Sequence, residues 1–411
     1  MKPEEIKAVT ELLVDLRTSA KKACDVDVQQ KVELLVDNMR LLFVEQAIVE
    51  VMSTHYDFGE VTGVSRLFNG LINQNFSVTT NNGSRCFQLF IKRYRKQATE
   101  REILFEHRCN AYLTSNDFPE VAKLIKTKDG RSFIEHHVKH LDPPGKCSKF
   151  AVYTFLEGED RYGWITPYCS KADLASASAM FAKIHERGFG FKAGEHAKEE
   201  PKIIPLMDVF ERYFVELEEK VRTDGTRGTS AAYFLEKLPS YRKALEICQP
   251  LKEKCQDMLE LMIHGDYHPG NQKYSDHGVT GVFDFDWCKE DLRLFDVAIT
   301  ITYFCTSWKE HENGMLFMEE IKVLLEAYQA YLLGSKNIYP LTEKELAVLP
   351  EMIILANMYV IWWDLQEIFN VEESESCEGQ CLVYLDHNTR INEFALEHLE
   401  ELRAVVGSLG D

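Results

Sequence analysis

Apolar positions follow a helical period at the start of the chain and a strand-like pattern further on. Up to about residue 43 they recur every three or four residues, as at Ile6, Val9 and Leu13, which is the spacing of one face of an α-helix. From Val61 onward they form short runs bounded by turn residues: VTGVSRLF, FSVTT, the turn NNGS and RCFQLFIKRY. We therefore predict a helical extension over residues 1–43, followed by an antiparallel sheet.

The rest of the chain alternates between the same two patterns. Residues 100–113 return to helical spacing, and VAKLIKT with RSFIEHHV indicates a further hairpin. After AVYTFLEGED helical spacing dominates, interrupted by two strand-like runs, LMIHGD and VTGVFDFDW. This pattern predicts a two-lobed α+β fold, with a small antiparallel-sheet lobe with one helix over residues 44–155 and a mostly helical lobe over residues 156–411.

Composition narrows the class of protein. The formal net charge of −19 argues against a nucleic-acid partner, because phosphate backbones select basic surfaces, and mildly favours neutral or cationic substrates. The longest apolar run, residues 352–363, is shorter than the roughly 18 residues that a membrane span needs. The N-terminus lacks the apolar stretch of a secretory signal, and the eleven cysteines are scattered. We expect a cytoplasmic protein with reduced thiols and no membrane contact.

One segment carries the residues that phosphoryl transfer needs. It reads HGDYHPGN, followed by GVFDFDW. Asp266 and Asn271 have the spacing of a kinase catalytic loop, in which the Asp serves the attacking hydroxyl and the Asn binds a metal ion. Asp284 ends a strand-like run and supplies a second oxygen ligand. The segment predicts a kinase that uses ATP and Mg²⁺.

These two motifs together resemble the signature of the aminoglycoside phosphotransferase and choline kinase superfamily, which is related to the protein kinases. In that family Gly replaces the Arg of the HRD motif, as Gly265 does here, and an Asp between hydrophobic residues replaces DFG, as Asp284 does. The run LFDVA is similar to a downstream helix start whose Asp supports the catalytic loop, a role that the resemblance gives to Asp296. The resemblance implies a protein-kinase-like bilobal fold.

Other polar residues of this segment have more than one interpretation. His264 is interpreted as a supporting residue of the loop, and His268 as a side chain that packs beside Pro269. Asp286 is a candidate substrate or metal contact and equally a candidate for a solvated or helix-capping carboxylate.

The first lobe is expected to bind the nucleotide. The run GLINQNFSV is similar to the family's phosphate-covering hairpin, which singles out Gly70 and Asn73. In CFQLFIKRYRK the family pattern selects Lys92 as the phosphate-binding lysine. A helix carboxylate should hold that lysine, and the resemblance favours Glu106 over Glu102, which stays open as the alternative. AVYTFLEGED is similar to the hinge that binds adenine through backbone groups, near Tyr153 to Leu156.

The phosphate acceptor is the least determined part of the prediction. The sequence PLTEKELAVLPEMI and the Trp-bearing segment after it resemble type II homoserine kinases. The expected acceptor is a hydroxyl of a small molecule: an amino alcohol, an amino acid such as homoserine, an amino sugar or an aminoglycoside. Two alternatives remain, a nucleotide-binding pseudokinase or scaffold and a protein Ser/Thr kinase. The helical extension is a candidate surface for a homodimer.

Overall fold

The computed structural model describes residues 26–67, 73–223, 228–369 and 378–409. The chain divides into two compact units, one made of Met1–Ala98 with Lys123–Phe155 and the other of Thr99–Ala122 with Leu156–Asp411. The helix over residues 100–115 thus belongs to the second unit by its packing, although it is surrounded in sequence by the first. The functional domains predicted from the sequence, 44–155 and 156–411, stay a prediction.

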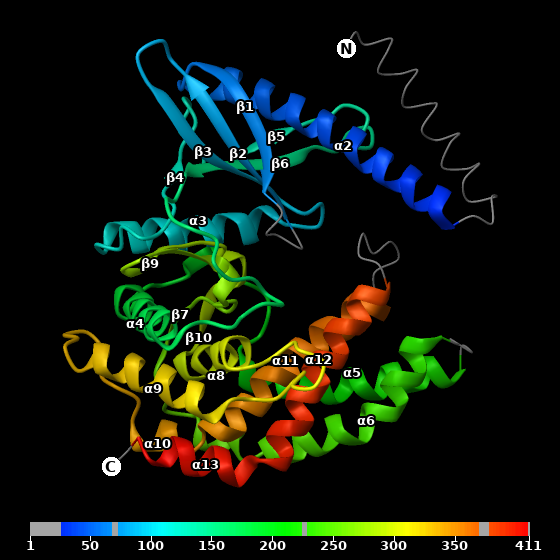
Figure 1. Cartoon of the computed structure of the whole chain (residues 1–411), viewed down its shortest axis with the longest axis vertical. Coiled ribbons are helices and arrows are strands. Elements are labelled where there is room, and N and C mark those ends of the chain that lie inside the picture. The colour runs from blue at the N-terminus through cyan, green and yellow to red at the C-terminus, as the bar shows by residue number, and fades with distance from the viewer. Residues whose placement is uncertain (1–25, 68–72, 224–227, 370–377, 410–411) are drawn as a thin grey trace. The chain divides into compact units, whose positions relative to one another are not determined.

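The described part of the first unit is built on a six-stranded antiparallel sheet (Figure 1). Its order is β1-β2-β3-β6-β4, with β5 also paired to β6. In the strands, buried side chains alternate with more exposed ones on β2, as the period of a half-buried strand requires. The strands are β1 (Glu60–Leu67), β2 (Gln74–Asn81), β3 (Cys86–Arg93), β4 (Leu124–Ile125), β5 (Ile134–His136) and β6 (Ser148–Thr154).

The predicted hairpin between residues 121 and 138 is wrong in its pairing. Strands β4 and β5 both occur, but each pairs with β6 and not with the other. The apolar strand β6, with Phe150 and Val152 fully buried, offers a long partner on which both short strands find backbone hydrogen bonds. The turn around Gly130 still closes locally, because Thr127 N–H donates to Arg131 O at 2.9 Å.

Helix α2 (Val26–His55) packs its C-terminal half into the core of the first unit. Val44, Ile48 and Val51 are buried at helical spacing and join β-sheet residues such as Phe76 and Ile91 in one cluster. The helix continues well past residue 43, where the predicted extension ends. The apolar positions expected between residues 1 and 25 lie outside the described residues.

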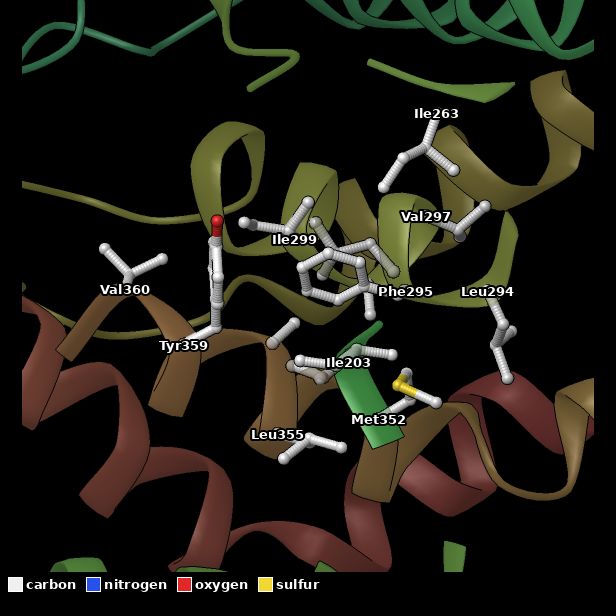
Figure 2. Close-up of a cluster of buried hydrophobic side chains, with 14 of the residues drawn as sticks. Ile203, Ile263, Leu294, Phe295, Val297, Ile299, Met352, Leu355, Tyr359 and Val360 are labelled. Carbon is white, nitrogen blue, oxygen red and sulfur yellow. The ribbon is translucent and has the colours of Figure 1, made fainter. Parts of the chain in front are cut away.

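The second unit is mostly helical (Figure 1). Helix α11 is buried along most of its length and packs with α8, β7 and the start of α5 in the cluster drawn in Figure 2. The helices are α3 (Glu100–Ser115), α4 (Lys171–Gly188), α5 (Ile203–Thr223), α6 (Thr229–Cys248), α7 (Leu251–Lys254), α8 (Arg293–Phe304), α9 (Met318–Leu332), α10 (Glu343–Leu346), α11 (Leu349–Phe369), α12 (Glu378–Glu397) and α13 (Leu399–Gly407).

Two short antiparallel strand pairs hold the polar segment of the second unit. Strand β7 (Glu260–Ile263) pairs with β10 (Lys289–Leu292), and β8 (Gln272–Ser275) pairs with β9 (Gly278–Val282). The β8–β9 hairpin therefore lies between β7 and β10 along the chain. The two connections carry the short helices η2 (Pro269–Asn271) and η3 (Phe285–Trp287), and with them both predicted motifs.

The structure confirms the predicted α+β class, with an antiparallel sheet in one unit and helices dominating the other. Among the described helices, none combines the length and the apolar character needed to cross a bilayer.

Candidate active site

The predicted catalytic loop leaves β7 through a backbone turn that only glycine fits. Gly265 has a φ of +76°, and a Cβ atom there would lie 2.5 Å from the backbone oxygen of Trp287. Both the left-handed backbone and this close approach exclude a side chain. Trp287 belongs to the second motif, so the glycine lets the two motifs touch.

The carboxylate of Asp296 fixes the backbone of this turn. This carboxylate is fully buried on α8 and accepts the backbone N–H of His264 at 2.7 Å and that of Gly265 at 2.8 Å. Buried backbone donors need such partners, and a carboxylate makes a charge-assisted bond to each. The contacts fix the backbone of the turn, and the role of Asp296 in supporting catalysis stays a prediction.

Two residues that the sequence interpretation missed continue this network. His185 on α4 is fully buried, and its Nε2 lies 3.0 Å from Asp296 Oδ2. The His185 Nδ1 atom lies 2.7 Å from the hydroxyl of Tyr328 on α9. A signal was present in the sequence, because His185 follows Phe181 by one turn and so places an ionisable ring on the apolar face of the predicted helix.

His264 is a neutral, fully engaged side chain. Its Nε2 donates to Phe283 O at 3.2 Å, and its Nδ1 accepts the N–H of Asp266 at 3.3 Å. Burial lowers the pKa of this imidazole, because the charged form loses its hydration. A ring with both nitrogens occupied has no lone pair left for a substrate proton, so His264 links the two motifs and orients Asp266.

Asp266 presents its carboxylate at the surface of the loop, with the side chain about 20% exposed. Asn271 Nδ2 donates to Asp266 Oδ2 at 3.2 Å and to Asp266 O at 3.0 Å. Burial, and next the negative charge of Asp284, raise the pKa of Asp266 well above its usual range. The Tyr303 hydroxyl also interacts with this carboxylate.

Asp284 lies on strained backbone directly after β9. Its φ of +66° is one of three positive values at non-glycine residues in the described chain, and such strain concentrates at functional sites. The N–H of the preceding Phe283 donates to Asn271 O at 3.1 Å, so Asn271 and Asp284 are held side by side. Within the described residues nothing donates a hydrogen bond to Asn271 Oδ1. Together the two side chains offer oxygens that suit Mg²⁺.

Asp286 and His268 line the same loops. The backbone oxygen of Asp286 accepts a hydrogen bond from the Lys198 ammonium, and the Asp286 side chain is partly buried. His268 Nδ1 accepts the N–H of Gly270 at 3.0 Å, and its ring lies 5.0 Å from that of Trp164. His268 packs in the site, and burial lowers its pKa to about 3. The contacts leave both interpretations of Asp286 open.

The nucleotide-binding residues predicted in the first unit lie on its sheet. Lys92 is buried on β3, opposite Asn75 of β2, with its ammonium 5.2 Å from the centre of the Tyr94 ring. Asn73 is buried, and its Oδ1 accepts the N–H of Arg95 at 2.9 Å. Tyr153 lies within β6, paired with both β3 and β4. Gly70 falls outside the described residues.

The remaining predicted residues belong to the second unit. Glu106 is buried on α3. Its rival Glu102 has another task, because its Oε2 accepts the N–H of Thr99 at 2.7 Å in a capping box at the start of α3. Leu156 follows the end of β6 and packs close to Gly281 of β9. The roles of these residues toward a nucleotide stay predictions.

One loop carries a carboxylate and an amide, and a second carboxylate lies on left-handed backbone after the β8–β9 hairpin. This set of residues is typical of a kinase-like phosphotransferase. Residues 63–331 match the phosphotransferase enzyme family, more than half of the chain, and the chain belongs to that family. It is a small-molecule kinase of the kind that includes aminoglycoside phosphotransferases and choline kinases.

Individual relatives are distant. The chain is 23% identical to a homoserine kinase of Methylobacillus flagellatus over 353 residues, 85% of this chain and 93% of that protein. Amicoumacin kinase, solved in complex with AMP-PNP, Ca²⁺ and Ami, has a TM-score of 0.58 at 17% identity, and the match covers 86% of this chain and 93% of that chain. A choline kinase of Cryptosporidium parvum has a TM-score of 0.51 at 13% identity, covering 84% and 92%. The two solved structures show the shared fold.

Proposed function

We propose that this protein transfers the γ-phosphoryl group of ATP, with Mg²⁺, to a hydroxyl group of a small molecule. The observation that carries the proposal is the grouping of Asp266, Asn271 and Asp284 on two loops joined by the bond between Phe283 N–H and Asn271 O. Phosphoryl transfer requires little more from a protein than positioned oxygen ligands and a group that serves the acceptor proton. All three residue types are present, which distinguishes the proposal from a pseudokinase.

The donor set fits a magnesium ion. Mutual repulsion of Asp266 and Asp284 contributes to the raised pKa of Asp266, and a divalent cation beside them would remove that cost. In the proposal Asn271 and Asp284 hold the ion, which when bound neutralises charge on the transferred phosphoryl group. Within the described residues no group of three or more His, Cys, Asp or Glu side chains could hold a metal ion by itself. Phosphate oxygens complete the ligand shell of a kinase site.

The residues of the chain have separate tasks in this mechanism. Asp266 accepts or orients the proton of the acceptor hydroxyl, His264 and Asp296 hold Asp266 in place, and Lys92 binds phosphate oxygens. Glu106 orients Lys92; it is preferred to Glu102, which already caps α3. Adenine would contact backbone beyond β6, toward Leu156, because the Tyr153 backbone lies between two paired strands.

Homoserine is the first acceptor to test, because several relatives carry the name homoserine kinase. A coupled assay of ADP release tests the proposal directly, with ATP, Mg²⁺ and a panel of amino acids, amino alcohols, sugars and amino sugars. We expect release that depends on both Mg²⁺ and one class of acceptor. ATP turnover by the folded protein that is independent of every acceptor would contradict it, and transfer to a protein Ser or Thr would support the alternative.

A further inference from the structure

The segment between α4 and α5 contacts the second catalytic motif, and both belong to the second unit. In this segment, the Lys198 ammonium donates a hydrogen bond to the backbone oxygen of Asp286. The same ammonium lies 5.7 Å from the centre of the Trp287 ring. One side chain thus contacts two of the residues of η3, the turn that directly follows Asp284.

These contacts replace the usual ion pair of a lysine. Lys198 is partly buried, and among the described residues no Asp or Glu side chain forms an ion pair with it. The other lysines of the segment differ, because Lys192 lies 4.0 Å from Glu290 and Lys202 pairs with Glu260. An ammonium that is bonded to a carbonyl and placed over an aromatic face stabilises the backbone that carries both groups.

The segment is attached to its surroundings on both sides of Lys198. Directly before this lysine, Ala197 O accepts a hydrogen bond from Arg101 Nε of α3 at 2.7 Å. Two residues after it, Glu200 pairs with the Lys289 ammonium of β10 at 2.7 Å. Because α3 and β10 both hold the segment, Lys198 is a fixed support for η3 and not a free surface side chain.

Asp284 needs such a support because of its backbone conformation. Its φ of +66° lies in the left-handed region, which a residue other than glycine keeps only where its surroundings hold it. On one side, the N–H of Phe283 donates to Asn271 O at 3.1 Å. On the other side, Lys198 holds the carbonyl of Asp286, two residues after Asp284. The backbone at Asp284 is therefore held between two hydrogen-bonded points.

We propose that Lys198 is a positioning residue that holds η3 and thereby keeps the Asp284 carboxylate in position to bind Mg²⁺. This inference rests on the proposed function, in which Asp284 is a metal ligand. Lys198 itself touches neither metal nor substrate in the proposal and acts through the backbone of η3. Groups that orient a metal ligand in this way contribute on the order of 10- to 100-fold to metal affinity.

Charge and position make opposite predictions for this lysine. By its charge alone, Lys198 repels Mg²⁺ and attracts the nucleotide anion, so its removal should strengthen the binding of the metal ion. If Lys198 positions Asp284, its removal should weaken the binding of the metal ion instead. The sign of the change in Mg²⁺ affinity therefore separates the two roles.

The experiment is calorimetry of AMP-PNP binding to the full chain, in EDTA and at a series of Mg²⁺ concentrations. It gives the nucleotide affinity without metal and the half-saturating Mg²⁺ concentration, at which half of the gain in affinity is reached. Lys198→Met keeps the length of the side chain and removes the ammonium. We expect the half-saturating Mg²⁺ concentration to rise on the order of 10- to 100-fold.

Two further variants locate the effect. Lys192→Met removes the same charge from a side chain of the same segment that is 85% exposed, and should change the half-saturating Mg²⁺ concentration less than about threefold. Arg101→Gln removes the bond to Ala197 O while leaving Lys198 in place. It should raise the Mg²⁺ requirement in the same direction as Lys198→Met, and the double variant should show less than the sum of both effects, because they act through one segment.

Turnover gives a second measurement with the same expected pattern. In the ADP-release assay, Lys198→Met should have a low kcat at limiting Mg²⁺ that recovers as the Mg²⁺ concentration rises, with the KM of the acceptor unchanged. A purely structural role would instead lower kcat at every Mg²⁺ concentration and weaken nucleotide binding in EDTA as well, and that result would overturn the inference.

The outcomes separate this inference from the proposed function. An unchanged or lower Mg²⁺ requirement in Lys198→Met overturns the inference and leaves the kinase standing. If that variant does not fold, an unchanged requirement in Arg101→Gln, whose side chain is 44% exposed, overturns it as well. A raised requirement in a protein that transfers phosphate to no acceptor would support the role of Lys198 and overturn the proposed function. Absence of Mg²⁺-dependent nucleotide binding in the wild type overturns both.

Discussion

At the scale of single residues, the site depends on carboxylates that are held in defined positions by neutral partners. Asp266, Asn271 and Asp284 could be predicted from spacing, because a catalytic loop needs its residues at fixed distances along the chain. The link of His185 and Tyr328 to Asp296 could not, because it joins α4, α8 and α9, although the period of α4 does place His185 on the apolar face of that helix.

Replacing Asp266 by Asn should separate chemistry from binding. The amide keeps the size of the side chain and cannot accept the hydroxyl proton, so kcat should fall on the order of 10² to 10⁴-fold. ATP affinity, measured by calorimetry on the same variant, should be unchanged or tighter, because a negative charge near the phosphates is removed. Turnover close to that of the wild type would exclude Asp266 as the base.

The buried network of Asp296, His185 and Tyr328 should also affect catalysis, and its loss should be measurable as a decrease in kcat. Groups that orient a functional side chain from behind contribute on the order of 10- to 100-fold, so His185→Leu should lower kcat by that amount with little change in KM for ATP. Tyr328→Phe removes only the hydroxyl that bonds His185 Nδ1 at 2.7 Å and should have a smaller effect of the same kind. If both variants raised the KM for ATP as much as they lowered kcat, the effect would indicate general unfolding and not a role in positioning Asp266.

Asp364 lies on α11, where Asn388 Nδ2 donates to its Oδ2 atom at 2.7 Å. Burial raises the pKa of this carboxyl, which makes a prediction about stability. Its pKa is near 3.9 in an unfolded chain and about 8 in the folded protein, so the folded state holds the proton more tightly. Stability from this group is full below about pH 4 and is lost as the pH rises toward 8. Asp364→Asn should therefore be about 1–3 kcal/mol more stable than wild type at pH 8 and nearly equal at pH 4.

Urea unfolding of the ligand-free proteins at several pH values checks this prediction. Glu397→Gln is the matched control, because it removes an exposed carboxylate of the same unit, on α12, that is not among the causes of the raised pKa of Asp364. It should show no such pH-dependent gain. A destabilised Asp364→Asn at pH 8 would mean that the carboxylate has a cationic partner in the folded chain.

At the scale of elements, most helices and strands could be predicted from periodicity, and the errors concern ends and partners. The period of α2 continues through FVEQAIVEVM to His55, and the first glycine of the region is Gly59, so residue 43 offered no helix stop. The short strands β4 and β5 were expected to pair with each other. Their two or three residues carry too little pattern to choose a partner, and the longer strand β6 takes both.

Helix α2 should contribute to the stability of the first unit as a core element. Ile48 is fully buried while its neighbour Val49 is 41% exposed. Ile48→Ala should cost about 2–4 kcal/mol by removing packed methyl groups, whereas Val49→Ala should stay within about 0.5 kcal/mol. Chemical denaturation followed by circular dichroism measures both. A small loss for Ile48→Ala would place the helix outside the cooperative core.

At the scale of the whole molecule, the two-lobed architecture could be predicted because strand-like and helical textures occupy different parts of the chain. The assignment of α3 could not, since a helix inside the sheet region has two possible cores to join. Its residues Phe105, Cys109 and Leu113 belong to the core cluster of the second unit. The helical period shows which face of α3 is apolar, but it does not show which unit packs against that face.

Nucleotide and magnesium together should stabilise the whole protein. A ligand that binds only the folded state adds about 2.7 kcal/mol at a concentration 100 times its Kd, so AMP-PNP with Mg²⁺ should raise Tm. Chelation by EDTA should remove the gain, and Asp284→Ala should abolish it while keeping the ligand-free Tm close to that of the wild type. A full gain in Asp284→Ala would contradict the assignment of Asp284 to the metal.

The placement of the β8–β9 hairpin between the paired strands β7 and β10 has a consequence for the order in which the site forms. The β8–β9 hairpin closes a short connection, from Ser275 to Gly278, and small loops close fastest and at the lowest entropic cost. The β7–β10 pair, with Ile263 opposite Lys289, forms after this hairpin, because the hairpin lies between its two strands along the chain. Asp266 and Asp284 lie in the two stretches between these pairings, so neither is in place until the outer pair closes. We therefore expect activity to appear late in folding. Local opening of the β7–β10 pair should abolish activity under conditions in which the rest of the protein is still folded.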